Sequence, residues 1–256
     1  MLTVSAGNGI WWCIMALTGV GTCGLYRTQK GRTAAEQRKT LLICGFVVYA
    51  LYFIQRYFMF RDPVFFQMYG SAPKDFLIHL LPLHLCYSGL LLTMVGLYKD
   101  YEPLMGFGFY VGLLGAFMAM ISPDGYYNNQ SLLHLPTLFF YLTHGLLTVM
   151  YACIGLLGLF PHGWKTERKA LLVLILLTVV LHGINTLGER VGLEGMNYCY
   201  TLSPGGSGIL EMLWSWIPYP WIYVVLPGSL FFCLWAAVLN GLHRLWMKHG
   251  RGCIKA

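Results

Sequence analysis

Seven long apolar stretches follow one another along the chain, separated by short segments that carry charged, Gly and Pro residues. A helix needs about 20 mostly apolar residues to cross a bilayer, and each stretch approaches or exceeds that length. We therefore predict an all-α membrane protein, a bundle of seven transmembrane helices in one polytopic domain over residues 1–256. The predicted spans cover residues 8–26, 40–60, 75–98, 103–121, 131–160, 168–187 and 219–246.

The composition agrees with a bilayer as the surrounding solvent. Of the 256 residues, 57% are hydrophobic and 11% are charged, and the mean hydropathy is +0.60. Soluble domains carry about 25% charged residues. No basic residue precedes the first apolar stretch, whereas a secretory signal begins with a positive region, so we expect this stretch to be kept as the first span.

Basic residues indicate how the bundle is oriented. With seven spans, most of the 17 Lys and Arg residues fall in the first, third and fifth connections and in the C-terminal tail, and the other side receives Arg56, Arg61, Lys74 and Arg190. Because cytoplasmic connections collect Lys and Arg, we predict the N-terminus outside and the C-terminus inside. Short basic clusters of this kind face lipid headgroups, so we expect membrane lipids as partners and no nucleic acid.

The segment 188–218 differs from the other connections in length and content. It combines Asn197, Tyr198, Glu211, Trp214 and Trp216 with several Gly and Pro residues. Trp and Tyr favour the membrane interface, while Gly and Pro oppose one continuous helix. We predict an outer-side loop or a re-entrant segment.

Polar residues gather in the predicted outer half of the bundle, within about 20 Å of its outer end at 1.5 Å per helical residue. Such residues at membrane depth are functional candidates because burying them in hydrocarbon is unfavourable. They are His79, His84 and Cys86 on the third span, His134 and His144 on the fifth, His182 and Asn185 on the sixth, and Gln55 and Arg56 at the same level of the second.

Three interpretations of this cluster stay open. Each histidine can form a hydrogen bond between helices. Alternatively, His79, His134 and His182 can hold a zinc ion that keeps one position open for water. In the third interpretation, a cysteine and a histidine form a nucleophilic site. No helix carries a ligand pair like HExxH, so we favour a site without a metal or other cofactor.

Cys86 is the cysteine that stands apart, in the string Leu81-Pro82-Leu83-His84-Leu85-Cys86. Pro82 removes a helical hydrogen bond and predicts a kink just before the thiol. His84 lies two positions away, which is about 200° around a helix, so we expect it on nearly the opposite side. His144 lies at a comparable depth two spans later and is the better candidate for a base.

The same string, together with Ser122-Pro123-Asp124, His134, His144, Asn185 and Asn197-Tyr198, resembles the YwaF-like integral membrane proteins over about residues 58–238. That family is similar to animal multispan acyltransferases, which move fatty acyl chains between glycerophospholipids. The resemblance implies Cys86 as the nucleophile and His144 as its partner, because the relatives use a Cys in the span with this motif and a His two spans later. Its bacterial-type members imply a multi-pass protein in the plasma membrane of a bacterium.

Three hypotheses for the function follow. The first is a membrane-embedded, thiol-dependent lipid acyltransferase or lipase that acts on glycerolipid acyl esters from the outer leaflet side through Cys86 and His144. The second is a small-molecule transporter or receptor-like membrane protein, and the third is a zinc-dependent membrane hydrolase. The side chains expected to contact the substrate are His84, His134, His182, Asn185, Asn197 and Tyr198.

Overall fold

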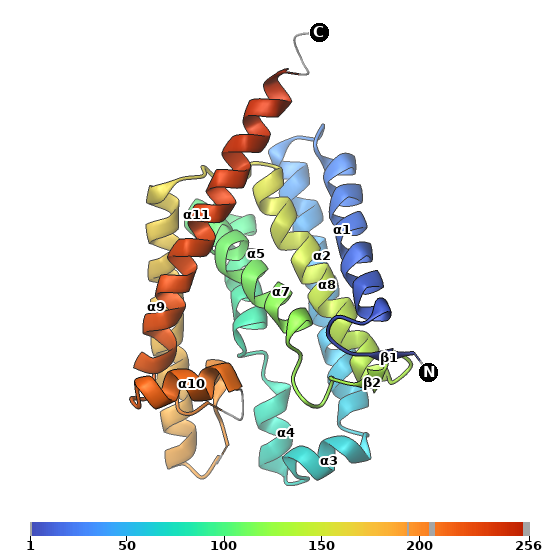
Figure 1. Ribbon diagram of the computed structural model, residues 1–256, viewed down its shortest axis with the longest axis vertical. Helices are drawn as coiled ribbons and strands as arrows, with labels where there is room; N and C mark the ends of the chain where they lie inside the picture. The colour runs from blue at the N-terminus through green and yellow to red at the C-terminus, as the bar shows by residue number, and fades with distance from the viewer. Residues whose placement is uncertain (1, 194, 205–207, 253–256) are drawn as a thin grey trace.

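The long apolar stretches form long helices in the computed structural model, which describes residues 2–193, 195–204 and 208–252 (Figure 1). Within these described residues, six helices are long and apolar enough to cross a membrane, and the bent pair α4 and α5 gives a seventh when it is counted as one span. The prediction of an all-α membrane bundle is therefore confirmed. The long elements are α1 (Gly9–Gln29), α2 (Ala34–Met59), α4 (Pro73–Leu80) with α5 (Leu85–Lys99), α6 (Glu102–Phe107) continued by the π-helical η1 (Gly108–Gly112) and α7 (Leu113–Ile121), α8 (Leu135–Leu156), α9 (Trp164–Arg190) and α11 (Ile222–Gly252).

Helix ends follow local signals that hydropathy does not detect. Asn8 caps α1 by accepting from the N–H of Trp11. Thr33 and Glu36 form a capping box at the start of α2, which satisfies backbone N–H groups that have no partner inside the helix. As a result α2 begins six residues before the predicted span 40–60, in a charged stretch that an apolar window leaves out.

The short elements collect at one end of the bundle (Figure 1). Strands β1 (Thr3–Val4) and β2 (Gln130–Ser131) pair antiparallel, and we call this end of the bundle the strand end. It also holds α3 (Pro63–Tyr69), the 3-10 turn η2 (Tyr198–Tyr200) and α10 (Gly208–Trp216). The segment 188–218 thus consists of the end of α9, a loop with η2, and α10, which runs across the direction of α9 and α11 (Figure 1).

Strand β1 and the last turns of α11 lie at opposite ends of the bundle, as an odd number of crossings requires (Figure 1). Strand β1 belongs to the strand end, and α11 extends past the other end of the bundle (Figure 1). The basic connection between α1 and α2 lies at that other end as well. If this basic end faces the cytoplasm, the strand end faces outward, as we predict from the basic residues.

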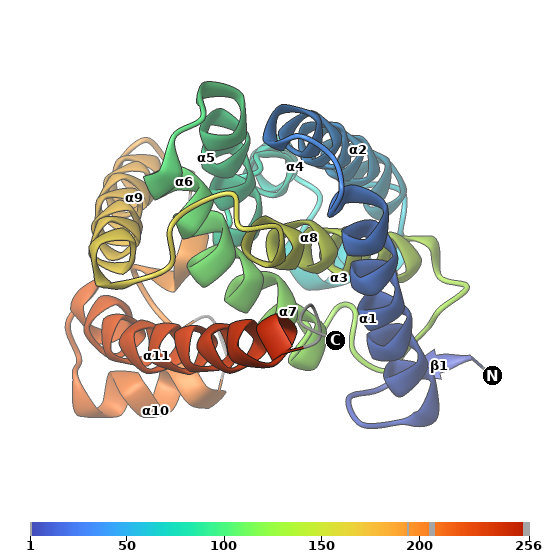
Figure 2. The same ribbon diagram turned by 90° about the horizontal axis from the view of Figure 1, so that it is seen from above.

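Helix α8 occupies the centre of the bundle, with α1 and α2 on one side and α6 and α7 on the other (Figure 2). Most of its side chains are buried, whereas the outer helices expose large apolar side chains such as Leu17, Val180 and Leu234. Apolar side chains that face outward on every peripheral helix suit contact with lipid. The central position of α8 brings His144 into the interior of the bundle.

Candidate functional site

The third span is broken at the residues that stood out in the sequence. Helix α4 ends at Leu80, α5 begins at Leu85, and the two helices are bent by 45°. Pro82 has no N–H to continue α4, and it holds the preceding residue, Leu81, in an extended conformation (φ −72°, ψ 128°). The predicted kink before Cys86 is therefore confirmed.

Tyrosine hydroxyl groups satisfy the backbone carbonyls that surround this break. Tyr52 donates to the carbonyl oxygens of His79 and Leu80, at 3.2 and 3.1 Å. Tyr198 donates to Ile78 at 2.6 Å. Backbone groups inside a membrane need protein partners in place of water, so hydrogen bonds of this kind allow a helix to stop there.

The first turn of α5 is held in the same way. The hydroxyl of Tyr151 donates to the carbonyl of Cys86 at 3.1 Å, and that of Tyr49 donates to the carbonyl of Tyr87 at 2.7 Å. These tyrosines come from α8 and α2, so two neighbouring helices fix the position of Cys86.

Cys86 lies in the first turn of α5, which begins at Leu85. His84 precedes the first helical residue and has an extended backbone (φ −63°, ψ 149°). Our expectation that His84 and Cys86 point to nearly opposite sides was wrong, because that estimate assumed one continuous helix. Both side chains line the same cavity.

That cavity has a volume of about 890 Å³, which is near the upper end of the range for small-molecule sites. Many of its polar side chains come from α2, α4, α5 and α8, and many of its apolar side chains come from η1, α7, α9 and α11. The polar set includes Arg56, His79, His84, Cys86, Tyr87, Tyr127 and His144, and the apolar set includes Val111, Leu114, Met118, Leu174, Val224 and Phe232.

His144 is held in one orientation by its own helix. Its Nδ1 lies 2.8 Å from the carbonyl oxygen of Phe140. Because a carbonyl only accepts, Nδ1 carries the proton, and in the neutral ring Nε2 is then the atom that can accept one. The rings of Phe140 and Tyr87 lie 4.3 and 5.7 Å from the His144 ring, centroid to centroid. His144 therefore presents a fixed proton acceptor in the cavity that Cys86 lines.

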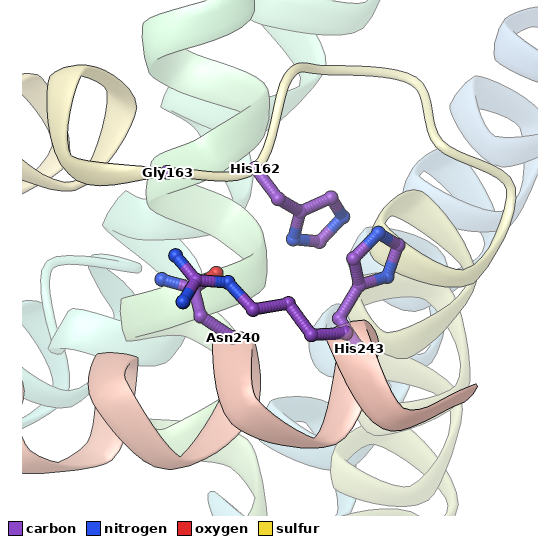
Figure 3. A pocket seen from close by; sticks show the side chains of 5 residues that line it. His162, Gly163, Asn240 and His243 are labelled. Carbon is purple, nitrogen blue, oxygen red and sulfur yellow. The ribbon is translucent and has the colours of Figure 1, made fainter. Parts of the chain in front are cut away.

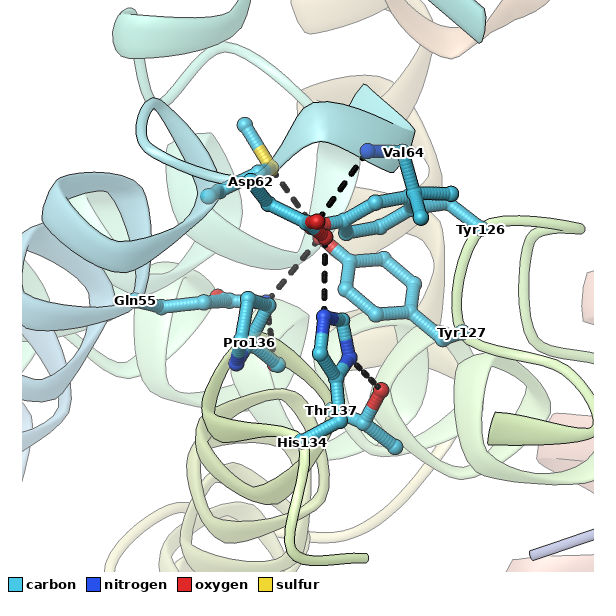
Figure 4. A network of polar contacts seen from close by, with 9 residues as sticks. Gln55, Asp62, Val64, Tyr126, Tyr127, His134, Pro136 and Thr137 are labelled. Carbon is cyan, nitrogen blue, oxygen red and sulfur yellow. Dashed lines mark hydrogen bonds and ion pairs between the residues drawn. The ribbon is translucent and has the colours of Figure 1, made fainter. Parts of the chain in front are cut away.

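His134 occupies a different place, in a network at the strand end (Figure 4). Its Nε2 lies 2.8 Å from Oδ2 of Asp62 and its Nδ1 lies 2.8 Å from Oγ1 of Thr137. Tyr126 donates to the same carboxylate oxygen at 2.5 Å. Both ring nitrogens of His134 are thus engaged, and His134 is not among the residues that line the cavity.

Asn185 and His182 on α9 also lie outside the cavity lining. The buried Asn185 amide donates to the carbonyl of Tyr198 and to Oγ1 of Thr201, and it accepts from the N–H of Tyr198. Asn185 therefore fixes the loop that covers the site, and Tyr198 and Asn197 of that loop do line the cavity.

The zinc set predicted from His79, His134 and His182 does not come together. His79 lines the cavity, whereas the other two histidines do not. Over residues 2–193, 195–204 and 208–252, no three His, Cys, Asp or Glu side chains are grouped so that they could hold a metal ion. Counting residues along each helix placed these histidines at a similar depth in the membrane. It could not show whether their side chains point towards one another, because that depends on how each helix is rotated about its axis.

Two further residues line the cavity: Arg56, for which the sequence indicated only its level in the bundle and no role, and Cys199, which the sequence did not identify. Arg56 is one of the few basic residues on the predicted outer side. Because Lys and Arg usually collect on the cytoplasmic side, its position is unusual and could have drawn attention to it. Cys199 comes from the loop after α9 and has a left-handed backbone (φ 56°, ψ 21°), an uncommon conformation for a residue other than Gly. Nothing in the linear pattern places Cys199 beside the third span.

A second cavity, of about 180 Å³, lies near the other end of the bundle, between α11 and the connection from α8 to α9 (Figure 3). The rings of His162 and His243 stack there with centroids 3.9 Å apart. Burial and the neighbouring His243 lower the pKa of His162. Asn240, which also lines this cavity, donates to the Glu167 carboxylate. The second cavity is small and polar, and neither Cys86 nor His144 lines it.

Residues 3–239 match the family model described as the TMEM164 family. No curated protein matches the chain. No solved structure matches it either.

Proposed function

Because the chain belongs to the TMEM164 family and is a multi-pass membrane protein, we propose that it is a thiol-dependent lipid acyltransferase or lipase whose nucleophile is Cys86 and whose general base is His144. The observation that carries the proposal is the shared cavity: one space of about 890 Å³ holds the thiol, an oriented histidine and an apolar section for an acyl chain. The resemblance of the Leu81–Cys86 string to YwaF-like proteins, and through them to multispan acyltransferases, supports it from the sequence. A location in the plasma membrane of a bacterium stays a prediction from the same resemblance.

In the proposed reaction, Nε2 of His144 takes the proton of the Cys86 thiol as Sγ attacks the carbonyl carbon of an acyl ester. The bond from that carbon to the alcohol oxygen breaks, and His144 gives the proton to the leaving lysolipid. The acyl group is then held as a thioester on Cys86. A second lipid alcohol or water then attacks the thioester carbon while His144 takes its proton. The bond from that carbon to Sγ breaks, the new ester or the free fatty acid leaves, and His144 returns the proton to Sγ.

The test is formation of an acyl group on Cys86. The purified full chain in detergent is mixed with phosphatidylcholine vesicles, and the peptide that contains Cys86 is analysed by mass spectrometry before and after hydroxylamine, which cleaves thioesters. Wild type should carry the acyl mass, Cys86→Ala should lose it, and His144→Ala should form it at least about 100-fold more slowly, the usual contribution of a general base.

Cys199→Ala is the matched control, because it removes another thiol that lines the same cavity and should leave the acylation of Cys86 intact. Labelling of the Cys86-containing peptide with a thiol-reactive probe should follow the same order, and the peptide is analysed separately because Cys13, Cys23 and Cys233 are exposed free thiols. Equal labelling of wild type, Cys86→Ala and His144→Ala would contradict the mechanism. A ligand-dependent thermal shift that survives Cys86→Ala, without lipid turnover, would instead favour the transporter or receptor-like hypothesis.

A further inference from the structure

We propose that Arg56 binds the phosphate group of the lipid substrate, so that the site takes phosphate-bearing glycerolipids in preference to neutral ones. This inference rests on the proposed function, because it assigns a substrate class to the same cavity. Arg56 lies in the last turn of α2, is 8% exposed, and lines the cavity together with Cys86 and His144.

The guanidinium of Arg56 has few protein partners for a buried cation. One nitrogen donates to Sδ of Met59 at 2.9 Å, and Cζ lies 4.6 Å from the centroid of the Tyr52 ring. Its Nε is buried without a hydrogen-bond partner. Buried charges in proteins are paired or bind a ligand, and a guanidinium offers five N–H donors in a fork that fits phosphate or carboxylate.

The carboxylates at the strand end do not compensate Arg56. Among the described residues no ion pair joins Arg56 to a carboxylate. The groups that interact with it electrostatically include tyrosines and histidines of the cavity: Tyr52, Tyr87, Tyr127, His79, His84 and His144. Asp62 is engaged by His134 and Tyr126.

Asp124 lines the cavity but accepts from the Tyr69 hydroxyl at 2.6 Å and from the N–H of Tyr126 at 2.9 Å. Glu189 also lines the cavity, and among the described residues no ion pair joins it to Arg56. Asp62 and Asp124 are held in other contacts, so the positive charge of Arg56 faces the cavity without a carboxylate partner.

A phosphate fits this place better than a carboxylate does, given the chemistry proposed for Cys86. In a glycerophospholipid the phosphate and the acyl esters share one three-carbon glycerol unit, so a phosphate anchored on Arg56 keeps an ester carbonyl in the cavity that the thiol lines. The apolar section along α7, α9 and α11 is then left for the acyl chain. Arg56 would act as a binding residue that selects the substrate, and Cys86 would carry out the reaction.

The experiment compares two lipids that differ in the phosphate. Turnover of phosphatidylcholine and of diacylglycerol with the same acyl chains is measured for the full chain in mixed micelles. We expect Arg56→Gln to raise KM for phosphatidylcholine at least tenfold more than it raises KM for diacylglycerol, which is a difference of about 1.4 kcal/mol. Arg56→Lys, which keeps the charge but loses the fork, should lie between the two. An equal loss for both lipids, or no loss for phosphatidylcholine, would overturn the proposal.

Arg61→Gln is the matched control, because Arg61 is an exposed arginine at the same end of the bundle whose guanidinium lies over the Tyr57 ring at 3.7 Å. It should leave both lipids unaffected. Thermal unfolding without lipid separates a ligand role from a structural one. Removing an uncompensated buried charge should keep or raise the Tm, so a large fall in Tm for both Arg56→Gln and Arg56→Lys would show a structural role and overturn the proposal.

A binding measurement keeps this inference separate from the proposed function. In a Cys86→Ala background, native mass spectrometry counts phosphatidylcholine bound with and without Arg56→Gln. Arg56-dependent binding without any acylation of Cys86 in wild type would support the phosphate site and contradict the acyltransferase. A thermal shift by inorganic phosphate that depends on Arg56, without binding of phosphatidylcholine, would overturn the lipid assignment and indicate free phosphate as the ligand.

Discussion

Gly112 lies at the end of η1, where the buried ring of Tyr151 packs directly against its Cα. A Cβ on Gly112 would lie 2.6, 2.7 and 2.8 Å from Cζ, Cε2 and Cε1 of Tyr151. The backbone at Gly112 is helical (φ −62°, ψ −44°), so Gly112→Ala is allowed by conformation and is opposed only by this contact. Tyr151 cannot move away freely, because its hydroxyl donates to the carbonyl of Cys86.

The magnitudes decide the sign of the effect. Replacing Gly by Ala inside a helix gains about 1 kcal/mol, whereas overpacking a buried site costs about 1–3 kcal/mol, and losing the hydrogen bond from Tyr151 to Cys86 costs about 1 kcal/mol more. We therefore expect Gly112→Ala to lower the free energy of unfolding by about 1–3 kcal/mol. Because Tyr151 also fixes the first turn of α5, acylation of Cys86 should slow as well.

The assay is unfolding of the purified protein by titration with SDS in mixed micelles, with the acylation of Cys86 measured on the same samples. Gly183→Ala is one control, because its Cβ would have nothing within 4 Å. Gly115→Ala is the other, because its Cβ would lie 3.7 Å from Sγ of Cys86, an ordinary van der Waals contact. Both controls should be at least as stable as wild type. A Gly112→Ala protein as stable as Gly183→Ala would refute the reasoning.

Two further predictions concern the strand end. Although burial raises the pKa of Asp62, hydrogen bonds from Tyr126, the N–H of Val64 and His134 outweigh it and hold that pKa below its ordinary value of 3.8. A carboxyl group with a lowered pKa contributes stability that is lost as the pH falls through its folded-state pKa. At pH values below about 4, the Tm of wild type should therefore decrease more steeply with falling pH than the Tm of Asp62→Asn. Parallel curves of Tm against pH would contradict this. Asn185→Leu leaves backbone groups of the 198–201 loop without hydrogen-bond partners. It should lower the free energy of unfolding by about 2–3 kcal/mol and make proteolysis of that loop faster. Protease resistance equal to that of wild type would show that Asn185 does not hold the loop in place.

The sequence by itself determined the membrane class, the helices and their approximate positions. Twenty-residue apolar stretches have few stable alternatives to helices in hydrocarbon, because every backbone polar group must find a partner within the chain. Pro82 likewise predicted the break before Cys86, because its missing N–H and the restricted conformation of the preceding Leu81 are local properties of the sequence. These features depend only on residues close together in the chain.

The tertiary structure alone decided which polar residues share a cavity. Depth along a helix follows from counting residues, but the direction of a side chain depends on how each helix is rotated by its neighbours. His134 directly precedes the first residue of α8, and His144 lies inside α8. Nevertheless, His134 is hydrogen-bonded to Asp62 and Thr137, whereas His144 lines the cavity together with Cys86. The uncompensated charge of Arg56 in that cavity depends on tertiary contacts too. The carboxylates Asp62 and Asp124 are held by residues that lie far from them in the sequence.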